Sequence, residues 1–460
     1  MAEDKPTQPG LKRDLGVWSA ASIVVGTVIG SGIFLVPQDM IGYVGSPAVL
    51  FAVWIFGGIL SLFGALTYAE LAAAMPEAGG EYVYLREAYG PFWGYLYGWT
   101  QMWVAKAGSV ATLATAFFYY LANFHPELDG VLYTLHLPIG PEGGPLEIRY
   151  GQLLAMSVIV VLAFVNYLGV KFGGGVQVAT TAVKVGLIAA IIAIGLGTSH
   201  GSIANYSSSI SVPGGAAGFF AALVGALWAY DGWNNVSMVS SEIRRPQRSL
   251  PLALIAGTAI VIAIYLLANL AYFYVLPASD VARSSRVAAD MMSRIFGPAG
   301  AGAVSIAAMA SIFAALNGSI LSGARVPYAM ARDGLFFRAV ARVNPRYHTP
   351  GISILALSAW SAVLVLSGRY RQLYTYVVFA SWILYGMTAA SVLVLRRKRP
   401  EMVRPYKTVG YPWVPVLFVL GSLAVVFFTF RQSPRESIMG LGFIFLGLPF
   451  YFHWRKRYLC

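Results

Sequence analysis

Cysteine is almost absent from this chain, because the only one among its 460 residues is the last, Cys460. A single cysteine excludes an intrachain disulfide and any CxxC metal or redox site. The five histidines form no HExxH motif and no pair at metal-ligand spacing. We therefore expect no metal, no cofactor and no catalytic residues, and we predict that the chain is not an enzyme.

Charged residues are also scarce. Asp, Glu, Lys and Arg make up 11% of the chain and hydrophobic residues 58%, against roughly 25% and 45–50% in soluble proteins. The net charge of +13 lies in basic residues placed between apolar stretches, which is typical of membrane topology rather than of nucleic-acid binding. The N-terminus lacks a signal-peptide pattern, so we expect the first apolar segment to be retained. The lipid bilayer is the expected surrounding, and no nucleic-acid partner is expected.

Long apolar segments dominate the rest of the chain. A membrane span needs roughly 20 apolar residues, and twelve segments meet this need. They lie near 14–41, 46–74, 88–122, 150–168, 174–197, 216–240, 250–276, 298–331, 351–367, 372–395, 412–430 and 436–453. The sequence therefore predicts an all-α membrane protein with twelve transmembrane helices.

Basic residues indicate the orientation of these helices. An even number of spans puts both termini on one side, and Lys and Arg concentrate in the tails and in the loops on that side, including RRKRP at 396–400 and RKR at 455–457. Such residues stay in the cytoplasm and suit an anionic inner leaflet. We predict a multi-pass protein of the plasma (inner) membrane with both termini cytoplasmic.

Two of the spans contain sequences that interrupt a helix. The first has Gly30-Ser31-Gly32 at its middle and the sixth has Tyr230-Asp231-Gly232. Non-helical backbone at membrane depth survives only where protein or a cavity surrounds it. Glycine packing between helices, as in the GxxxG motif at Gly26 and Gly30, is the alternative interpretation.

The two interruptions occupy matching places about 200 residues apart. This spacing is typical of an inverted repeat that binds substrate between two discontinuous helices, 1 and 6. We expect a cytoplasmic tail at 1–13, a first five-helix repeat at 14–197, a second at 216–395, two further spans at 412–453 and a cytoplasmic tail at 454–460.

Four stretches of the chain resemble a known family. They are GTVIGSGIF, GALTYAELAAAMPEAGGEYVYLREAYG, WAYDGWN followed by SEIRRPQRSLPLA, and NGSILSGARVPYAMARDGLF. Together they are similar to the amino acid–polyamine–organocation superfamily, and within it to the L-type amino acid transporter family. The resemblance covers about residues 14–425. It implies the leucine-transporter fold with a 5+5 inverted repeat, alternating access, and exchange of amino acids without sodium.

The chain departs from the family's eukaryotic members in one loop. Those members carry a cysteine between spans 3 and 4 that links them to a heavy chain. The corresponding loop here, residues 125–150, contains no cysteine. We therefore expect no disulfide-linked heavy chain and a solitary transporter of bacterial type.

The interruption in span 1 is expected to hold the carboxylate of an amino acid. Backbone N–H groups of Ser31, Gly32 and Ile33 begin the second half-helix, where they lack intrahelical partners and lie at its positive dipole end. The Ser31 hydroxyl can add a donor. Ile29 and Gly30 complete the broken segment, so we place all five residues in the substrate site.

The interruption in span 6 is expected to hold the ammonium group. Backbone carbonyls at the end of its first half-helix, from Trp228, Ala229, Tyr230 and Asp231, have no intrahelical donor. The Asp231 carboxylate would strengthen this contact or reach a cationic side chain, since intramembrane carboxylates usually have a function. A structural cap for its own helix is the alternative role for Asp231.

Family resemblance adds two roles near this second interruption. It implies that Trp228 is a gate that closes the site from outside, whereas packing is the ordinary role of an aromatic residue in a helical bundle. It also implies that Asn234 lines the pocket. Interhelical hydrogen bonding is an equally acceptable role for Asn234.

Two lysines lie within predicted spans, where each needs compensation. The resemblance implies that Lys184 replaces a sodium ion between spans 1 and 8, with a carbonyl near Gly26 and the Ser319 hydroxyl as partners. Lys106 is the second buried cation. It touches the transport pathway, or it pairs with Asp231 or a backbone carbonyl, and the sequence does not choose among these roles.

Four more charged residues are expected near the cytoplasmic ends of the spans. They are Glu70, Glu81, Glu242 and Arg325. We interpret them as members of gate or loop ion pairs rather than as coupling residues.

The function most consistent with these features is exchange of small or neutral L-amino acids without sodium. Proton-coupled symport and exchange of cationic amino acids remain alternatives within transport. A membrane enzyme would need carboxylate or histidine pairs, which are not seen, and a receptor would need a larger soluble domain than loops of about 25 residues provide.

Overall fold

The computed structural model describes residues 11–136, 145–366 and 370–458 of the chain. Residues 1–10 of the predicted N-terminal tail and Cys460 lie outside this description. Within it, helices account for nearly all regular structure, and the strands β1 (Val131–Leu135) and β2 (Leu146–Arg149) form a small antiparallel hairpin.

The helices follow one another in chain order. Their bounds are α1 (Val17–Val28), α2 (Gly32–Val44), α3 (Pro47–Ala74), α4 (Glu81–Tyr89), α5 (Pro91–Thr100), η1 (Gln101–Ala105), α6 (Lys106–Leu121), η2 (Pro126–Asp129), α7 (Tyr150–Tyr167), α8 (Val170–Gly197), η4 (Ile203–Ser207), α9 (Gly215–Tyr230), α10 (Asn235–Met238), η5 (Ser240–Glu242), α11 (Pro246–Val275), α12 (Ala278–Arg283), α13 (Val287–Phe296), α14 (Pro298–Gly323), α15 (Arg325–Arg332), η6 (Arg338–Ala341), α16 (Gly351–Val365), α17 (Tyr370–Lys398), α18 (Trp413–Gln432), α19 (Pro434–Phe445) and α20 (Gly447–Tyr458).

Nine segments in the described part of the chain are long and apolar enough to cross a membrane, with α1 and α2 taken together as one of them, and α9 and α16 are shorter apolar helices. The chain is therefore a multi-pass membrane protein. The predicted third span is helical from Pro91 to Leu121, but a π-helical turn at Gln101–Ala105 separates α5 from α6. The sequence contains no proline there, and this turn was not predicted.

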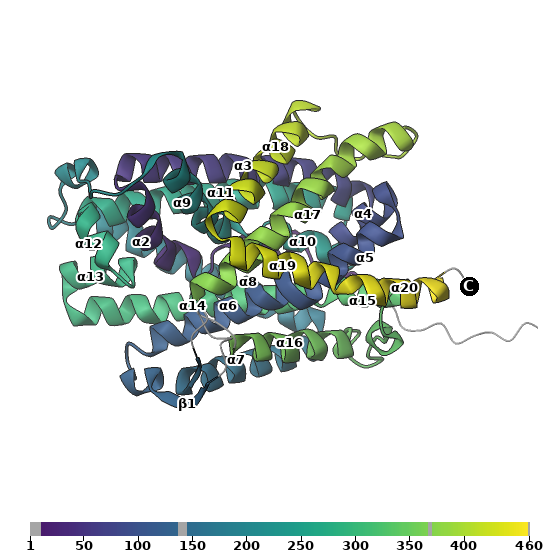
Figure 1. Cartoon of the computed structure of the whole chain (residues 1–460), viewed down its shortest axis with the longest axis horizontal. Coiled ribbons are helices and arrows are strands. Elements are labelled where there is room, and N and C mark those ends of the chain that lie inside the picture. The colour runs from purple at the N-terminus through teal and green to yellow at the C-terminus, as the bar shows by residue number, and fades with distance from the viewer. Residues whose placement is uncertain (1–10, 137–144, 367–369, 459–460) are drawn as a thin grey trace, which may run out of the picture.

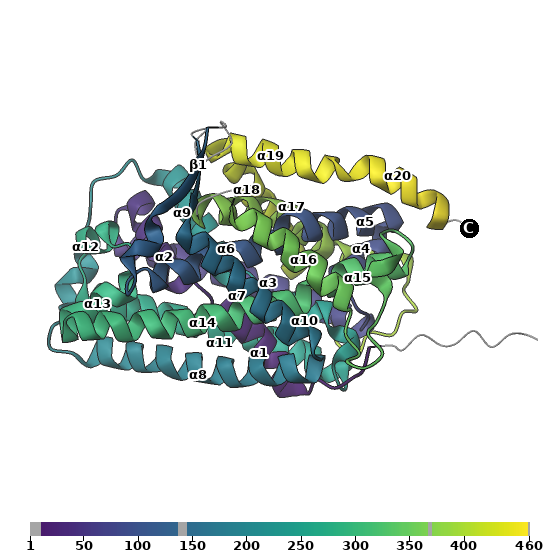
Figure 2. The same ribbon diagram turned by 90° about the horizontal axis from the view of Figure 1, so that it is seen from below.

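The helices form a bundle in which α3 and α14 run along the long axis, whereas α17 and α18 cross it obliquely (Figure 1). Helix α3 packs on α11, and α1 packs on α8, α11 and α14. In the perpendicular view, α8 lies along one edge of the bundle and α19 and α20 lie along the opposite edge (Figure 2). Helices α12 and α13 lie at one end of the long axis, and α4, α15 and the end of α20 lie at the other (Figure 1).

Both interruptions predicted from the sequence are present. Helix α1 ends at Val28, and α2 begins at Gly32 after Ile29 leaves the helical region at φ −72° and ψ 88°. Helix α9 ends at Tyr230, and Gly232 takes a φ of 107°, which glycine adopts at no steric cost. Glycine thus permits the turn after α9, whereas Ile29 makes the turn after α1 with a negative φ.

The two interrupted helices meet near the centre of the bundle. Helix α2 packs along α9, and the contact is close because Gly32 faces Ala229. A Cβ atom on Gly32 would lie 2.6 Å from the Ala229 Cα. The absence of a side chain at this position lets the two backbones approach and brings both helix ends to one place.

Two of the three predicted acidic partners form ion pairs. Glu242 binds the buried Arg325 guanidinium through both carboxylate oxygens, at 2.7 and 3.0 Å. Glu70 binds Arg396 at 2.7 Å. Glu81 instead accepts hydrogen bonds from amide and hydroxyl groups of the α10 region, so its expected ion pair was wrong.

Candidate substrate site between two interrupted helices

Unpaired backbone donors gather at the start of α2. The Ser31 carbonyl accepts from the N–H groups of Phe34 and Leu35, both at 3.2 Å, so the hydrogen-bond ladder of α2 begins with these residues. The N–H groups of Gly32 and Ile33 precede the ladder, where a helix has no intrahelical acceptor to offer. This helix end is therefore suited to an anionic group.

Two backbone carbonyls at the end of α9 are already engaged. The Trp228 carbonyl accepts from the Asp231 N–H at 3.1 Å, and the Ala229 carbonyl accepts from the Tyr265 hydroxyl at 2.9 Å. The same hydroxyl lies 2.8 Å from the Val28 carbonyl of α1. Tyr265 thereby joins the two interrupted helices. The carbonyls of Tyr230 and Asp231, at the end of α9, remain as acceptors for a cation.

A small pocket lies between the two interruptions. Its volume is about 20 Å³, and it is lined by Thr27, Val28, Gly30, Ser31, Gly32, Ser109, Leu113, Trp228, Asp231, Gly232, Asn235 and Ser319. A space of this size holds about one water molecule. The helix ends are therefore closed around the site, and admission of a larger molecule requires them to move apart.

Tyr370 closes one side of this pocket. Its hydroxyl accepts from Trp228 Nε1 at 2.8 Å and lies 2.9 Å from Ser31 Oγ. The Trp228 ring also stacks on Tyr374 with a centroid distance of 5.9 Å. The indole predicted to be a gate is thus held by two tyrosines of α17.

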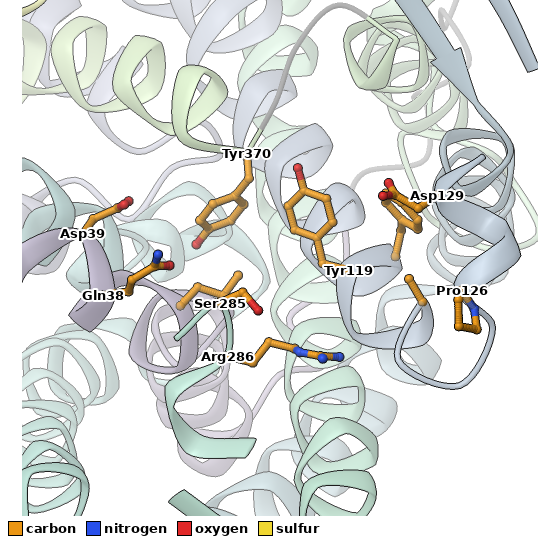
Figure 3. Close-up of a pocket in the computed structure, with 11 residues that line it drawn as sticks. Gln38, Asp39, Tyr119, Pro126, Asp129, Ser285, Arg286 and Tyr370 are labelled. Atoms are coloured by element: carbon orange, nitrogen blue, oxygen red, sulfur yellow. The ribbon is translucent and has the colours of Figure 1, made fainter. Parts of the chain in front are cut away.

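Beyond Tyr370 lies a larger cavity. It measures about 710 Å³ and includes Asp39, Tyr119 and Arg286 as well as Tyr370 itself. These side chains converge on it from separate parts of the chain (Figure 3). Tyr370 borders this cavity and also bonds to Ser31 and Trp228, which line the small pocket, so its side chain lies between the two spaces.

Lys184 of α8 binds the broken segment of span 1. Its ammonium lies 2.5 Å from the Gly26 carbonyl, 2.5 Å from the Ile29 carbonyl and 3.4 Å from the Ser311 carbonyl of α14. The residue is fully buried. An ammonium has three donors and no acceptor, so this set of carbonyls matches it and ties α8 to α1 and α14.

The contact predicted between Lys184 and Ser319 was wrong. The α14 partner of the ammonium is Ser311, whose hydroxyl also donates to the Ile29 carbonyl at 3.1 Å. Ser319 comes eight positions later in α14, about two helical turns away. It lines the small pocket instead.

Asp231 and Lys106 occupy neighbouring parts of the site. Asp231 lines the pocket, and its carboxylate accepts from the Tyr385 hydroxyl at 2.9 Å. Lys106 is buried, and its ammonium donates to Asn235 Oδ1 at 2.6 Å. The negative charge of Asp231 attracts this ammonium. Lys106 therefore has an amide as its direct partner, which the sequence did not indicate.

Asn234 does not line the pocket as the family resemblance implied. It is fully buried and donates to the Glu81 carboxylate, whereas Asn235 faces the pocket. Successive residues of a helical turn point about 100° apart, so only one of the two can face the site. The alternative role for Asn234, interhelical hydrogen bonding, fits its observed contact.

The remaining predicted residues contribute mainly backbone. The side chains of Ile29 and Ile33 are fully buried away from the pocket, and Ile29 serves through its carbonyl. The Tyr230 hydroxyl donates to the Trp54 carbonyl of α3 at 3.1 Å, away from the site. Ala229 provides the contact surface for Gly32.

Sequence reasoning missed several residues that complete the site. They are Tyr265, Ser311, Tyr370, Tyr385 and Asn235. The tyrosines belong to apolar helices that contain many aromatic residues, and a buried hydroxyl needs a partner. That need was the only available signal, and it did not identify which tyrosines reach the centre.

Comparison with known proteins places this arrangement in a family. Residues 15–448 match the model described as amino acid permease. The chain is 32% identical over 453 residues to the serine/threonine exchanger SteT of Bacillus subtilis (strain 168), covering 97% of this chain and 98% of that protein. It is 33% identical over 452 residues to the human b(0,+)-type amino acid transporter 1, covering 97% and 89%.

A third relative is the human cystine/glutamate transporter, 29% identical over 444 residues, with 96% of this chain and 85% of that protein covered. All three relatives are named as exchangers or transporters of amino acids, and each match spans nearly the whole of this chain. The chain therefore belongs to the amino acid permease family of the amino acid–polyamine–organocation superfamily, among its L-type amino acid transporters.

Proposed function

We propose that this protein is a sodium-independent exchanger of small neutral L-amino acids. The observation that carries the proposal is the meeting of two opposite helix ends in one pocket, with donors at Gly32 and Ile33 and acceptors at Tyr230 and Asp231. A zwitterion needs both kinds of group, because its two charges are costly to bury without partners. The relative SteT, named as a serine/threonine exchanger, supports a small substrate.

We further propose the leucine-transporter fold for the chain. In this arrangement twelve spans comprise two five-helix repeats, at 14–197 and 216–395, followed by two more spans at 412–453. In this proposal the protein lies in the plasma membrane, with both termini on its cytoplasmic side. Helix interruptions at matching positions of the two repeats support this proposal.

Independence from sodium is attributed to Lys184. Its ammonium contacts carbonyls of α1 and α14, which are groups that also bind a hard cation. A covalently attached charge remains there through the transport cycle. No sodium gradient then contributes to transport, and exchange of one amino acid for another becomes the favoured mode.

Alternating access follows from the sizes of the two spaces. The small pocket has a volume of about 20 Å³, whereas the cavity beyond Tyr370 has a volume of about 710 Å³. Substrate entry requires Tyr370 to separate from Trp228 and Ser31. At the opposite end, the Glu242–Arg325 pair and the contacts of Glu81 hold the bundle closed.

A cationic substrate is the second candidate, favoured by the carboxylate of Asp231 in the pocket wall. The Lys106 ammonium beside Asp231 opposes it, because a second positive charge would be repelled there. Proton-coupled symport is the remaining alternative. It requires a titrating group in the site, and Lys106, Lys184 and Asp231 are the groups available.

Uptake into proteoliposomes tests these proposals. Purified protein is placed in liposomes preloaded with unlabelled serine, and uptake of labelled serine, alanine, leucine and arginine is measured in sodium and in choline buffer. We expect uptake of the small neutral amino acids to require internal serine and to be equal in the two buffers. Uptake into empty liposomes that is driven by an inward proton gradient would instead indicate proton symport and contradict exchange.

A further inference from the structure

The cavity beyond Tyr370 has a charged lining of its own. The segment between α12 and α13 contributes to it, and its polar lining includes Gln38, Asp39, Tyr119, Asp129 and Arg286. The labelled side chains converge from α2, α6, η2 and the segment before α13 (Figure 3). It is separate from the small pocket between the interrupted helices.

Arg286 is the basic residue in the described lining of this cavity. Its side chain is half-buried and extends into the cavity below Tyr119 (Figure 3). Among the described residues, its guanidinium forms no ion pair and donates no hydrogen bond. The nearby Asp290 carboxylate is engaged by the Ser284 hydroxyl at 2.5 Å.

Both lining carboxylates already have partners. Asp39 accepts from the Tyr374 hydroxyl at 2.9 Å, and Asp129 pairs with Arg149 at 2.7 Å. Neither is bonded to Arg286. The guanidinium is therefore available to an incoming anion, and the open volume in front of it is large enough for an amino acid.

Guanidinium chemistry determines what fits this position. Its donors form a planar fork that matches a carboxylate through two parallel hydrogen bonds. We propose that Arg286 binds the carboxylate of an amino acid in this cavity, as a docking position that the substrate occupies before Tyr370 and Trp228 admit it to the inner site. This inference rests on the proposed exchange of amino acids.

The proposed docking position at Arg286 lies in the same cavity that Tyr370 borders. Tyr370 lines the cavity and bonds to Trp228 and Ser31, so a docked amino acid lies next to the side chains that must move. Docking there raises the local concentration of substrate at the gate. It acts on substrate that arrives from this face and not on substrate from the opposite face.

One-sided kinetics test the docking position. Arg286→Gln, Arg286→Lys and Arg283→Gln are expressed, the last as a control because Arg283 is an exposed arginine of α12 outside the cavity lining. Serine exchange is measured in intact cells and in inverted membrane vesicles, which present opposite faces. We expect Arg286→Gln to raise KM about tenfold on one face only, as for loss of a charged hydrogen bond.

The control variant and Arg286→Lys sharpen this test. Arg283→Gln should keep the KM of the unmodified protein. The KM of Arg286→Lys should lie between those of the unmodified protein and Arg286→Gln. Equal KM values for Arg286→Gln and the unmodified protein on both faces would overturn the docking position. An equal rise on both faces would also overturn it, because a general structural effect has no sidedness.

Competition by a carboxylate without an amine identifies the ligand group. Propionate should inhibit exchange by the unmodified protein from the same face, and Arg286→Gln should reduce this inhibition. Inhibition by chloride that equals inhibition by propionate would instead show a site for inorganic anions and overturn the assignment. Absence of amino acid exchange by the unmodified protein would refute the proposed function itself, which is a separate outcome.

Discussion

Tyr370 and Trp228 are joined by a hydrogen bond of 2.8 Å from the indole Nε1 to the phenol oxygen. The same phenol lies 2.9 Å from Ser31 Oγ. One hydroxyl of α17 thus connects the two interrupted helices on the side that faces the larger cavity. Any movement that opens the small pocket toward this cavity must break these bonds.

Tyr370→Phe and Trp228→Phe should therefore weaken closure of the site. Each removes the hydrogen bond between the two rings and keeps an aromatic ring. A neutral hydrogen bond contributes about 0.5–1.5 kcal/mol, so we expect bound substrate to be released up to about tenfold faster while equilibrium affinity changes less. Tyr376→Phe, on the same helix but with its hydroxyl at Met439, is the control and should release substrate at the unmodified rate. Release rates are measured by dilution of labelled substrate.

Gly32→Val should abolish transport, whereas Ser31→Ala should be mild. A Cβ atom on Gly32 would lie 2.6 Å from the Ala229 Cα, so a branched side chain forces the two helices apart and covers the backbone donors. Ser31→Ala removes one hydroxyl and leaves those donors in place. Serine binding and serine exchange are measured for both variants. The reverse ranking would mean that the hydroxyl, rather than the backbone, binds the carboxylate.

Lys184→Ala should fold poorly or transport poorly, because it leaves the Gly26 carbonyl without this donor and the Ile29 carbonyl with the Ser311 hydroxyl alone. Each orphaned buried carbonyl costs about 1–3 kcal/mol. Lys171→Ala, an exposed lysine of the same helix, should match the unmodified protein in melting temperature and exchange. Normal exchange by Lys184→Ala would refute the role of the ammonium as a fixed cation.

Asp231→Asn separates three roles of this carboxylate. Contact with the substrate ammonium predicts weaker binding of alanine and arginine alike, by about 3–5 kcal/mol when one partner of a buried pair is removed. Contact with a substrate side chain predicts weaker binding of arginine alone. A helix-capping role predicts a lower melting temperature with affinity unchanged. Tyr385→Phe removes the hydroxyl that bonds to Asp231 and serves as the comparison for loss of that bond alone.

Glu242→Gln should destabilise the protein strongly, and Asp280→Asn should not. The Glu242–Arg325 side chains are 0% and 1% exposed, whereas those of the Asp280–Arg294 pair are both 47% exposed. Removing one partner of a buried ion pair costs about 3–5 kcal/mol, while an exposed pair contributes about 0–1 kcal/mol. Melting temperatures of the two variants check this contrast. Equal shifts would mean that the buried pair contributes no more than the exposed one.

Local chemistry explains which features were predictable from the sequence. Apolar length indicated the membrane helices, and glycine beside a polar residue indicated both interruptions, since each depends on a few neighbouring residues. The contact of Lys184 with the Gly26 carbonyl was also anticipated through family resemblance, and it is present. The roles of these residues in transport remain predictions.

Only the tertiary structure decided which side chains reach the centre. The rotation of α10 turned Asn235, not Asn234, toward the pocket, because neighbouring helical residues point about 100° apart. The depth of α14 in the bundle brought Ser311, not Ser319, to Lys184; eight residues correspond to about 12 Å along a helix. The sequence by itself determined where the helices break, and the packing of whole helices determined what each break contacts.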